Sequence, residues 1–123
     1  MKTLDKAILA SRIIGERKAQ NPVLFEVSKL TSISDYFLIA SGSSSRQVQS
    51  ISRHLSRKMR EKGLKAYGVE GEKEGHWILM DYGDLIIHLF YEPIREFYNL
   101  EGLWIEAPRI DLKDDIINKK QNN

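Results

Sequence analysis

The 123-residue chain contains no cysteine, which excludes disulfides, thiolate metal ligands and cysteine nucleophiles. It also contains no apolar run near the length of about 18 residues that a membrane-spanning helix needs. Its first residues, Met1 to Asp5, begin a helical pattern with an early acid, unlike a secretory signal or transit peptide. We therefore expect a cytosolic protein without a membrane contact. The length predicts one domain whose core needs no cross-links.

The charges of the chain are separated along its length, although the net charge is only +2. Residues 44–62 contain six basic residues and one acid, a net charge of +5. Residues 81–106 contain six acids and one basic residue, a net charge of −5. This distribution predicts a polarised molecule whose acidic side suits a basic partner.

Hydrophobic periodicity predicts the element order α-β-β-α-β-β-β-α. The helices are expected at 4–17, after Thr3 as N-cap, at about 45–62, before Gly63, and at 94–100; the strands are expected at 23–27, 36–40, 66–70 and in a hairpin over 77–90. We predict an α/β (α+β) fold in which two or three helices pack on a mixed five-stranded sheet. The domain should span residues 1–107, and a polar tail should follow at 108–123.

The hairpin over residues 77–90 is predicted to have two chemically different faces. With Tyr82-Gly83 as a two-residue turn, Trp77 lies opposite His88 and Asp81 lies opposite Asp84. The other face is aliphatic and should be core: Ile78, Met80, Leu85, Ile87 and Leu89. Like charges directly opposite each other are destabilising in a sheet, so the face with the acids needs a reason other than stability.

That reason is predicted to be a protein partner. Trp77, Tyr82 and Phe90 could simply belong to the core, but Trp and Tyr also dominate the binding energy of protein interfaces. An apolar centre ringed by acids is typical of an interface rather than of a ligand pocket. The prediction requires that the helix at 94–100 leaves this face of the hairpin uncovered.

The Ser41–Ser45 segment follows a buried strand and opens a helix, where free N–H groups can bind phosphate. It is not a P-loop, since the Gly-Lys-Ser/Thr sequence is missing. The Gly42-Ser43 pair is similar to that of nucleotidyltransferases, which hold two metal-binding carboxylates about ten residues further on. Residues 47–56 contain no Asp or Glu. The serines are therefore predicted to cap the helix, and a nucleotide-binding enzyme remains an alternative.

Two further groups of residues have a functional and a plain interpretation. Asp81, Asp84 and His88 could bind a divalent cation, but Tyr-Gly is an ordinary turn and Trp77 should stack on the imidazole. We expect no metal, no cofactor and no catalytic residue.

The second group is a basic stripe at spacings of seven, four and three residues: Arg46, Arg53, Arg57 and Arg60. A solvated helix face is favoured; contact with an RNA backbone is the alternative, although no aromatic RNA-binding platform accompanies it.

Several motifs in one order resemble the Iojap family, the ribosomal silencing factors. They are Asp35-Tyr36-Phe37, the run 42–48, Val69-Glu70-Gly71, Trp77-Ile78, the run 81–84, the apolar pattern that ends at His88, and the run 95–104. The match covers about residues 5–104. The resemblance implies a nucleotidyltransferase-like fold that lacks the catalytic carboxylates.

The resemblance also implies a non-enzymatic repressor of translation. Members bind the large ribosomal subunit through its ribosomal protein number fourteen and sterically prevent the small subunit from joining; some are homodimers when free. On this basis we expect the partner-binding residues to be Trp77, Asp81, Tyr82, Gly83, Asp84 and His88, with Arg46, Glu70 and Arg95 at the rim. The aromatic and imidazole rings should pack against the partner, and the acids should pair with its Lys or Arg side chains. Peripheral contact with ribosomal RNA is a further expectation.

Overall fold

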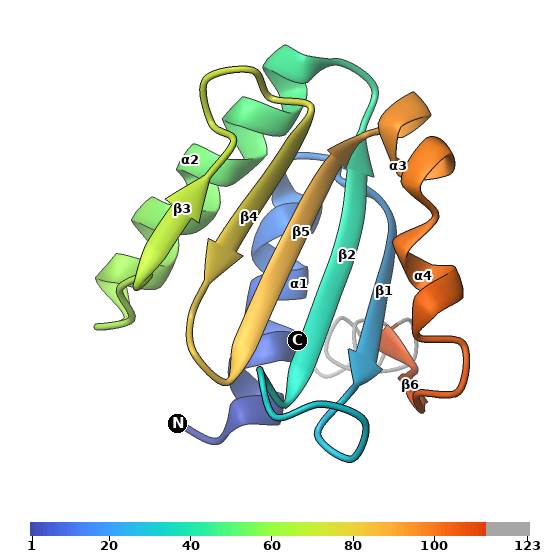
Figure 1. Cartoon of the computed structure of the whole chain (residues 1–123). Helices are drawn as coiled ribbons and strands as arrows, with labels where there is room; N and C mark the ends of the chain where they lie inside the picture. The colour runs from blue at the N-terminus through green and yellow to red at the C-terminus, as the bar shows by residue number, and fades with distance from the viewer. Residues whose placement is uncertain (113–123) are drawn as a thin grey trace.

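Six strands form one mixed sheet in the computed structural model, which describes residues 1–112 (Figure 1). The strands are β1 (Gln20–Glu26), β2 (Tyr36–Gly42), β3 (Gly68–Glu70), β4 (Trp77–Asp81), β5 (Leu85–Tyr91) and β6 (Arg109–Ile110); the helices are α1 (Thr3–Glu16), α2 (Ser45–Glu61), α3 (Glu92–Tyr98) and α4 (Leu100–Leu103). Their order across the sheet is β3-β4-β5-β2-β1-β6. Strands β2 and β5 are parallel, and the other pairs are antiparallel.

The predicted mixed α/β class is confirmed, but the predicted number of strands is wrong. Residues Arg109 and Ile110 pair with Leu24 and Phe25 of β1 and add a sixth strand. Leu112 is also buried, so the folded domain continues past the predicted boundary at residue 107. The rest of the predicted tail, from residue 113, lies outside the described residues. No helix within residues 1–112 is long and apolar enough to cross a membrane.

Helices α1 and α2 cover one face of the sheet, which lies at the back in Figure 1. The apolar stripe of α2 is fully buried there, as its spacing predicted: Val48, Ile51, Leu55 and Met59. The helix begins after Ser44, whose side-chain oxygen accepts a hydrogen bond from the Gln47 N–H. It ends at Glu61 with Lys62 as its C-cap, and Gly63 follows with the positive φ of 79° that favours glycine.

Helix α1 begins without the predicted cap. Its N-cap residue is Lys2, which makes no side-chain capping bond. Thr3 is the first helical residue, and its hydroxyl donates instead to the Asp84 carboxylate. The prediction of Thr3 as N-cap was wrong because an acceptor 81 residues away in the chain binds the same hydroxyl.

The other face of the sheet holds a second core that is only partly covered. Its buried members are Phe25, Val27, Phe37, Ile39, Ile86, Phe90 and Ala107. Trp104, which follows α4, packs edge-on against Phe37 at a ring-centroid distance of 5.0 Å. Figure 1 shows α3 and α4 along the β1 side, whereas no helix of the described chain lies in front of β3 and β4. This face is therefore closed over β1 and β2 and open over β3 and β4.

Candidate functional site

The β4–β5 hairpin has the predicted faces but a different register. Trp77 pairs with Phe90 and Leu79 pairs with His88, two residues away from the predicted partners. The Tyr82 N–H donates to the Leu85 carbonyl at 2.9 Å, so the turn residues are Gly83 and Asp84 rather than Tyr82 and Gly83. Because strand side chains alternate with a period of two, a shift of two residues leaves every side chain on its predicted face.

Tyr82 does not share the face of Trp77. It lies in the core under α1 and α2, where it is 4% exposed. Burial raises the pKa of Tyr82 to about 12. The prediction that Tyr82 contacts a partner beside Trp77 is contradicted, because the two residues differ by an odd number of positions and so point to opposite faces.

The two acids stabilise the hairpin turn and do not face each other. The Gly83 N–H donates to Asp81 Oδ1 at 2.7 Å, and Gly83 has a φ of 83°. Asp84 accepts the Thr3 hydroxyl bond and forms an ion pair with Lys6. Partial burial raises the pKa of Asp84, but its bonds to Lys6 and Thr3 outweigh burial, so the pKa is lower than usual. The predicted repulsion between opposed carboxylates is therefore absent from this part of the chain.

Trp77 is held in one orientation by the residues around it. Its indole Nε1–H donates to His88 Nδ1 at 3.1 Å, and its ring stacks on Phe90 at 4.8 Å. On its outer side the indole meets the Tyr98 ring at 5.2 Å. Trp77 is half-buried, so one part of the ring is anchored while the rest faces solvent. The predicted stacking of Trp77 on His88 is replaced by a hydrogen bond between tilted rings.

His88 holds Trp77 from the neighbouring strand β5, and its own side chain is too buried to contact a partner. It is 5% exposed, and burial lowers its pKa to about 4. Since Nδ1 accepts the indole N–H, the neutral imidazole carries its proton on Nε2. Nε2 is buried and has no hydrogen-bond partner among the described residues. The prediction that His88 packs against a partner is contradicted by this burial.

The predicted rim residues lie in three different environments. Glu70 is exposed on β3 opposite Leu79, so it borders the open part of the sheet. Arg46 is exposed on α2, which covers the opposite face. Arg95 is 6% exposed and donates to Glu101, Ser41 Oγ and the carbonyls of Gln20 and Asn21. Arg95 is therefore not a rim residue, because its guanidinium joins α3 to the ends of β1 and β2.

Two aromatic side chains of α3, outside the predicted hairpin site, extend the surface. Phe97 is 80% exposed and Tyr98 is 54% exposed on α3. Their rings meet edge-on at 5.2 Å, and Tyr98 continues to Trp77. Neighbouring helix residues point about 100° apart, so both rings of an adjacent pair cannot face the sheet. We call the surface formed by Glu70, Trp77, Leu79, Asp81, Phe97 and Tyr98 the open sheet surface.

The Gly42-Ser43 loop is occupied by side chains of its own helix. Gln47 Oε1 accepts bonds from the Ser43 N–H at 2.6 Å and from the Ser43 hydroxyl at 2.8 Å. Together with the Ser44 cap, these bonds occupy the N–H groups of Ser43 and Gln47, two of the donors that a phosphate at this helix end would use. The predicted capping role of the serines is confirmed. Within residues 1–112, no three His, Asp or Glu side chains are grouped to hold a metal ion.

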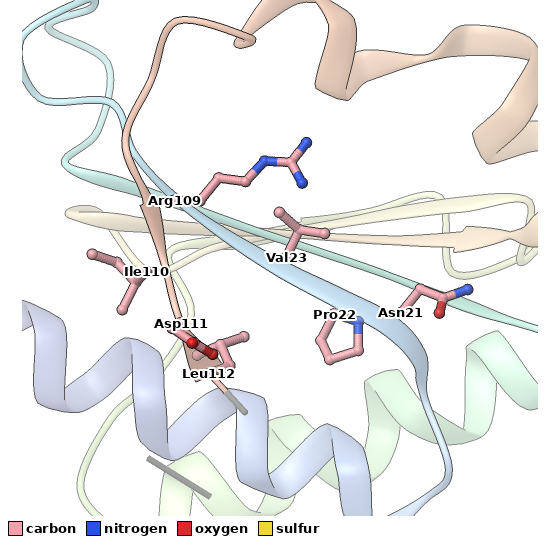
Figure 2. Close-up of a pocket in the computed structure, with 7 residues that line it drawn as sticks. All are labelled: Asn21, Pro22, Val23, Arg109, Ile110, Asp111 and Leu112. Atoms are coloured by element: carbon pink, nitrogen blue, oxygen red, sulfur yellow. The ribbon is translucent and has the colours of Figure 1, made fainter. Parts of the chain in front are cut away.

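A hollow at the opposite edge of the sheet offers no reactive grouping. It has a volume of about 580 Å³ and is lined by residues of β1 and the β6 segment: Asn21, Pro22, Val23, Arg109, Ile110, Asp111 and Leu112 (Figure 2). The Arg109 guanidinium lies over the Phe25 ring at 5.0 Å, which is a cation–π contact. The hollow lies near β6, at the other end of the strand order from the open sheet surface.

Comparison with known proteins gives one consistent family. The family model "Ribosomal silencing factor during starvation" matches residues 1–123. A ribosomal silencing factor from Bacillus subtilis is 36% identical over 110 residues, which are 88% of this chain and 93% of the relative. One from Halalkalibacterium halodurans is 36% identical over 105 residues, which are 85% of this chain and 90% of the relative. A crystal structure of a Chromobacterium violaceum protein superposes with a TM-score of 0.83 at 32% identity and covers 85% of this chain and 87% of that one.

Proposed function

The chain belongs to the family of ribosomal silencing factors, and from this we propose that it represses translation by docking on the large ribosomal subunit. The family resemblance seen in the motifs is thereby confirmed, and the family role is regulatory. The finer part of the proposal is that the open sheet surface binds ribosomal protein number fourteen of that subunit. The docked protein then occupies space that the small subunit needs for joining.

The composition of the open sheet surface supports a basic protein partner. Its centre is apolar, with Leu79 and Trp77 half-buried and Tyr98 beside them. The carboxylates of Glu70 and Asp81 border this centre on β3 and β4. An apolar centre with a charged rim is the usual arrangement of a specific interface, and rim charges of one sign steer a partner of the opposite sign.

The rigidity of Trp77 is the single observation that carries this proposal best. Binding costs conformational entropy whenever a side chain must be ordered at the interface. Trp77 is already ordered by the His88 hydrogen bond and the Phe90 ring. An aromatic ring that is partly exposed and also held in place is therefore suited to act as an anchor for a partner.

The buried members of the predicted site act from behind the surface rather than on it. His88 orients Trp77, and Arg95 holds in place the helix that carries Tyr98. Gly83 and Asp84 shape the turn at the end of the hairpin. A standard interface covers about 800 Å² of each partner, which is enough to block subunit joining in the cytosol without any chemical step.

Co-sedimentation with purified large subunits tests the proposal. The Glu70→Lys/Tyr98→Ser double variant reverses one rim charge and removes one exposed ring, and neither side chain is buried. We expect its affinity for the subunit to fall at least about tenfold, since interface anchors contribute more than about 1 kcal/mol each. Subunit joining, followed by light scattering, should be inhibited correspondingly less.

The control variant is Leu30→Ser/Ile33→Ser, which removes two exposed apolar side chains from the loop between β1 and β2. It should bind and inhibit like the unchanged protein. Equal binding by both variants would show that docking does not use the open sheet surface. The oligomeric state of each variant is measured in parallel, because the homodimer predicted for the free protein would compete for exposed apolar side chains.

A further inference from the structure

A second hollow lies on the helical side of the sheet, between the end of α1 and the middle of α2. It has a volume of about 310 Å³ and is lined by Arg17, Ser50, Arg53, His54 and Arg57. Arg17 is the C-cap residue of α1, and the other four residues belong to α2. We call this hollow the arginine pocket. It lies on the opposite face of the sheet from Trp77, because α1 and α2 pack on the other core.

The arginine pocket concentrates the positive charge of three guanidinium groups, and the carboxylate of Glu16 approaches it through a bond to His54. Arg53 and Arg57 are four residues apart, so their side chains leave α2 on the same side about 6 Å apart. Arg17 adds a third guanidinium from another helix. None of the three forms an ion pair with an acid of residues 1–112. Three unpaired guanidinium groups that line one hollow repel each other, and an anion would relieve that repulsion.

A hydrogen-bond relay through the buried His54 fixes one of these arginines. The Arg57 guanidinium can only donate, so it donates to His54 Nδ1, at 3.1 Å. The His54 proton must then lie on Nε2, which donates to Glu16 Oε1 at 2.8 Å. His54 is 7% exposed, so its ring cannot turn freely. Arg57 is therefore held at the pocket, at the cost of side-chain entropy that a purely solvated residue would keep.

We propose that the arginine pocket binds phosphate groups of an RNA backbone, with Arg17, Arg53 and Arg57 each contacting one of them. Ser50 supplies a hydroxyl at the same hollow, and His54 acts as a positioning residue for Arg57. Guanidinium groups match phosphate oxygens in pairs of parallel hydrogen bonds. This assignment goes beyond the proposed protein docking and involves none of its residues.

The exposure of the pocket favours a polymer over a small anion. All three arginines are exposed, so water and salt screen each contact with a single free phosphate. A nucleic acid overcomes screening because each neutralised phosphate releases condensed counterions. No Phe, Tyr or Trp lines the pocket, and the imidazole of His54 is buried, so the pocket lacks the exposed aromatic platform on which single-stranded bases usually stack. The site should therefore bind backbone phosphate without reading sequence.

Binding of a labelled ten-nucleotide oligouridine, measured by fluorescence anisotropy at two salt concentrations, tests the proposal. Three phosphate contacts predict that affinity falls about twentyfold between 50 and 200 mM salt, and one contact predicts about threefold. The Arg53→Gln/Arg57→Gln variant should bind at least about tenfold more weakly at 50 mM and show the smaller salt response.

The matched control is Arg46→Gln/Arg60→Gln, which removes the same charge from exposed positions of the same helix outside the pocket. It should retain the salt response of the unchanged protein. Equal losses in the two double variants would overturn the pocket in favour of diffuse attraction to the helix. Tight binding of inorganic phosphate without binding of oligouridine would overturn the assignment to RNA.

His54 is tested by its effect on the salt response. His54→Leu removes both hydrogen bonds of the relay and should reduce the response by about one phosphate contact, whereas His54→Gln keeps a donor and an acceptor and should restore it. An unchanged response in His54→Leu would exclude a positioning role. The Glu70→Lys/Tyr98→Ser variant should bind oligouridine normally, so this proposal and the protein-docking proposal can fail independently.

Discussion

At the scale of single residues, the pairing of Trp77 with His88 joins stability to the proposed function. The imidazole must be neutral to accept the indole N–H, and its burial favours that neutral form. A protonated His88 would place an uncompensated charge between Leu79 and Ile39, its neighbours on the adjacent strands. The orientation of the proposed anchor ring therefore depends on the charge state of the residue beneath it.

The first prediction concerns the pH dependence of stability. His88 has a folded pKa of about 4 against an ordinary value of 6.5, so the unfolded chain binds more protons between these values. The free energy of unfolding should therefore fall as the pH drops from 6.5 to 4, by up to about 3 kcal/mol from this residue. Urea unfolding followed by tryptophan fluorescence at several pH values measures this fall.

The variant that tests this prediction is His88→Gln, whose amide oxygen can accept the indole N–H but does not titrate. Its free energy of unfolding should vary less between pH 6.5 and 4 than that of the unchanged protein. Asp84 does not confuse the comparison, because both proteins contain it and its lowered pKa contributes equally to the two pH profiles. Parallel pH profiles in the two proteins would contradict the role given to His88.

At the scale of secondary structure, Arg95 determines where α3 lies. One guanidinium binds the carbonyls of Gln20 and Asn21 at the start of β1 and the hydroxyl of Ser41 near the end of β2. The same group pairs with Glu101 in α4 at 2.8 Å. A helix of only seven residues has little stability alone, so these bonds keep Phe97 and Tyr98 at the edge of the open sheet surface.

The second prediction follows from this arrangement. Arg95→Met should lower the free energy of unfolding by about 3 kcal/mol, because buried acceptors lose a charged donor that no water replaces. Arg95→Lys keeps the charge but cannot reach all four acceptors and should lose part of that amount. Urea unfolding measures both losses. Glu96→Met, a change at the adjacent exposed position, serves as control; an equal effect there would contradict the anchoring role.

At the scale of the whole molecule, the two proposed binding surfaces lie on opposite faces of one sheet. The open sheet surface includes side chains of β3, β4 and α3, whereas the arginine pocket is built on α1 and α2. The core between them is continuous and buried. One partner of ordinary size could not cover both surfaces. The proposed ribosomal protein and the proposed RNA backbone would therefore bind on opposite sides of the docked protein.

The third prediction is that changes on the two surfaces act independently. If both surfaces contact the large subunit, the binding losses of Glu70→Lys/Tyr98→Ser and Arg53→Gln/Arg57→Gln should add within about 0.5 kcal/mol in the combined variant. Residues separated by a packed core share no partner, which is the condition for additivity. Co-sedimentation of the three proteins measures the losses. A combined loss well outside the sum would show that the two surfaces are coupled.

Local sequence patterns predicted those features that depend on neighbours along the chain. The period of Val48, Ile51, Leu55 and Met59 determined the buried side of α2, and Gly63 marked its end. Alternation along residues 77–90 placed Trp77 and His88 on one face and Met80 on the other. These patterns suffice because the helical and strand periods are properties of the backbone itself.

Only the tertiary structure decided which distant groups meet. It paired Thr3 with Asp84, enclosed Arg95 between β1 and α4, and brought Arg17 beside Arg53. It also placed the hairpin turn at Gly83 and Asp84, where the two acids have partners of their own. Sequence spacing carries no distance between residues far apart in the chain. A charged or aromatic side chain is removed from water only where other parts of the chain pack against it. Its exposure therefore depends on which distant residues lie close to it in the folded protein.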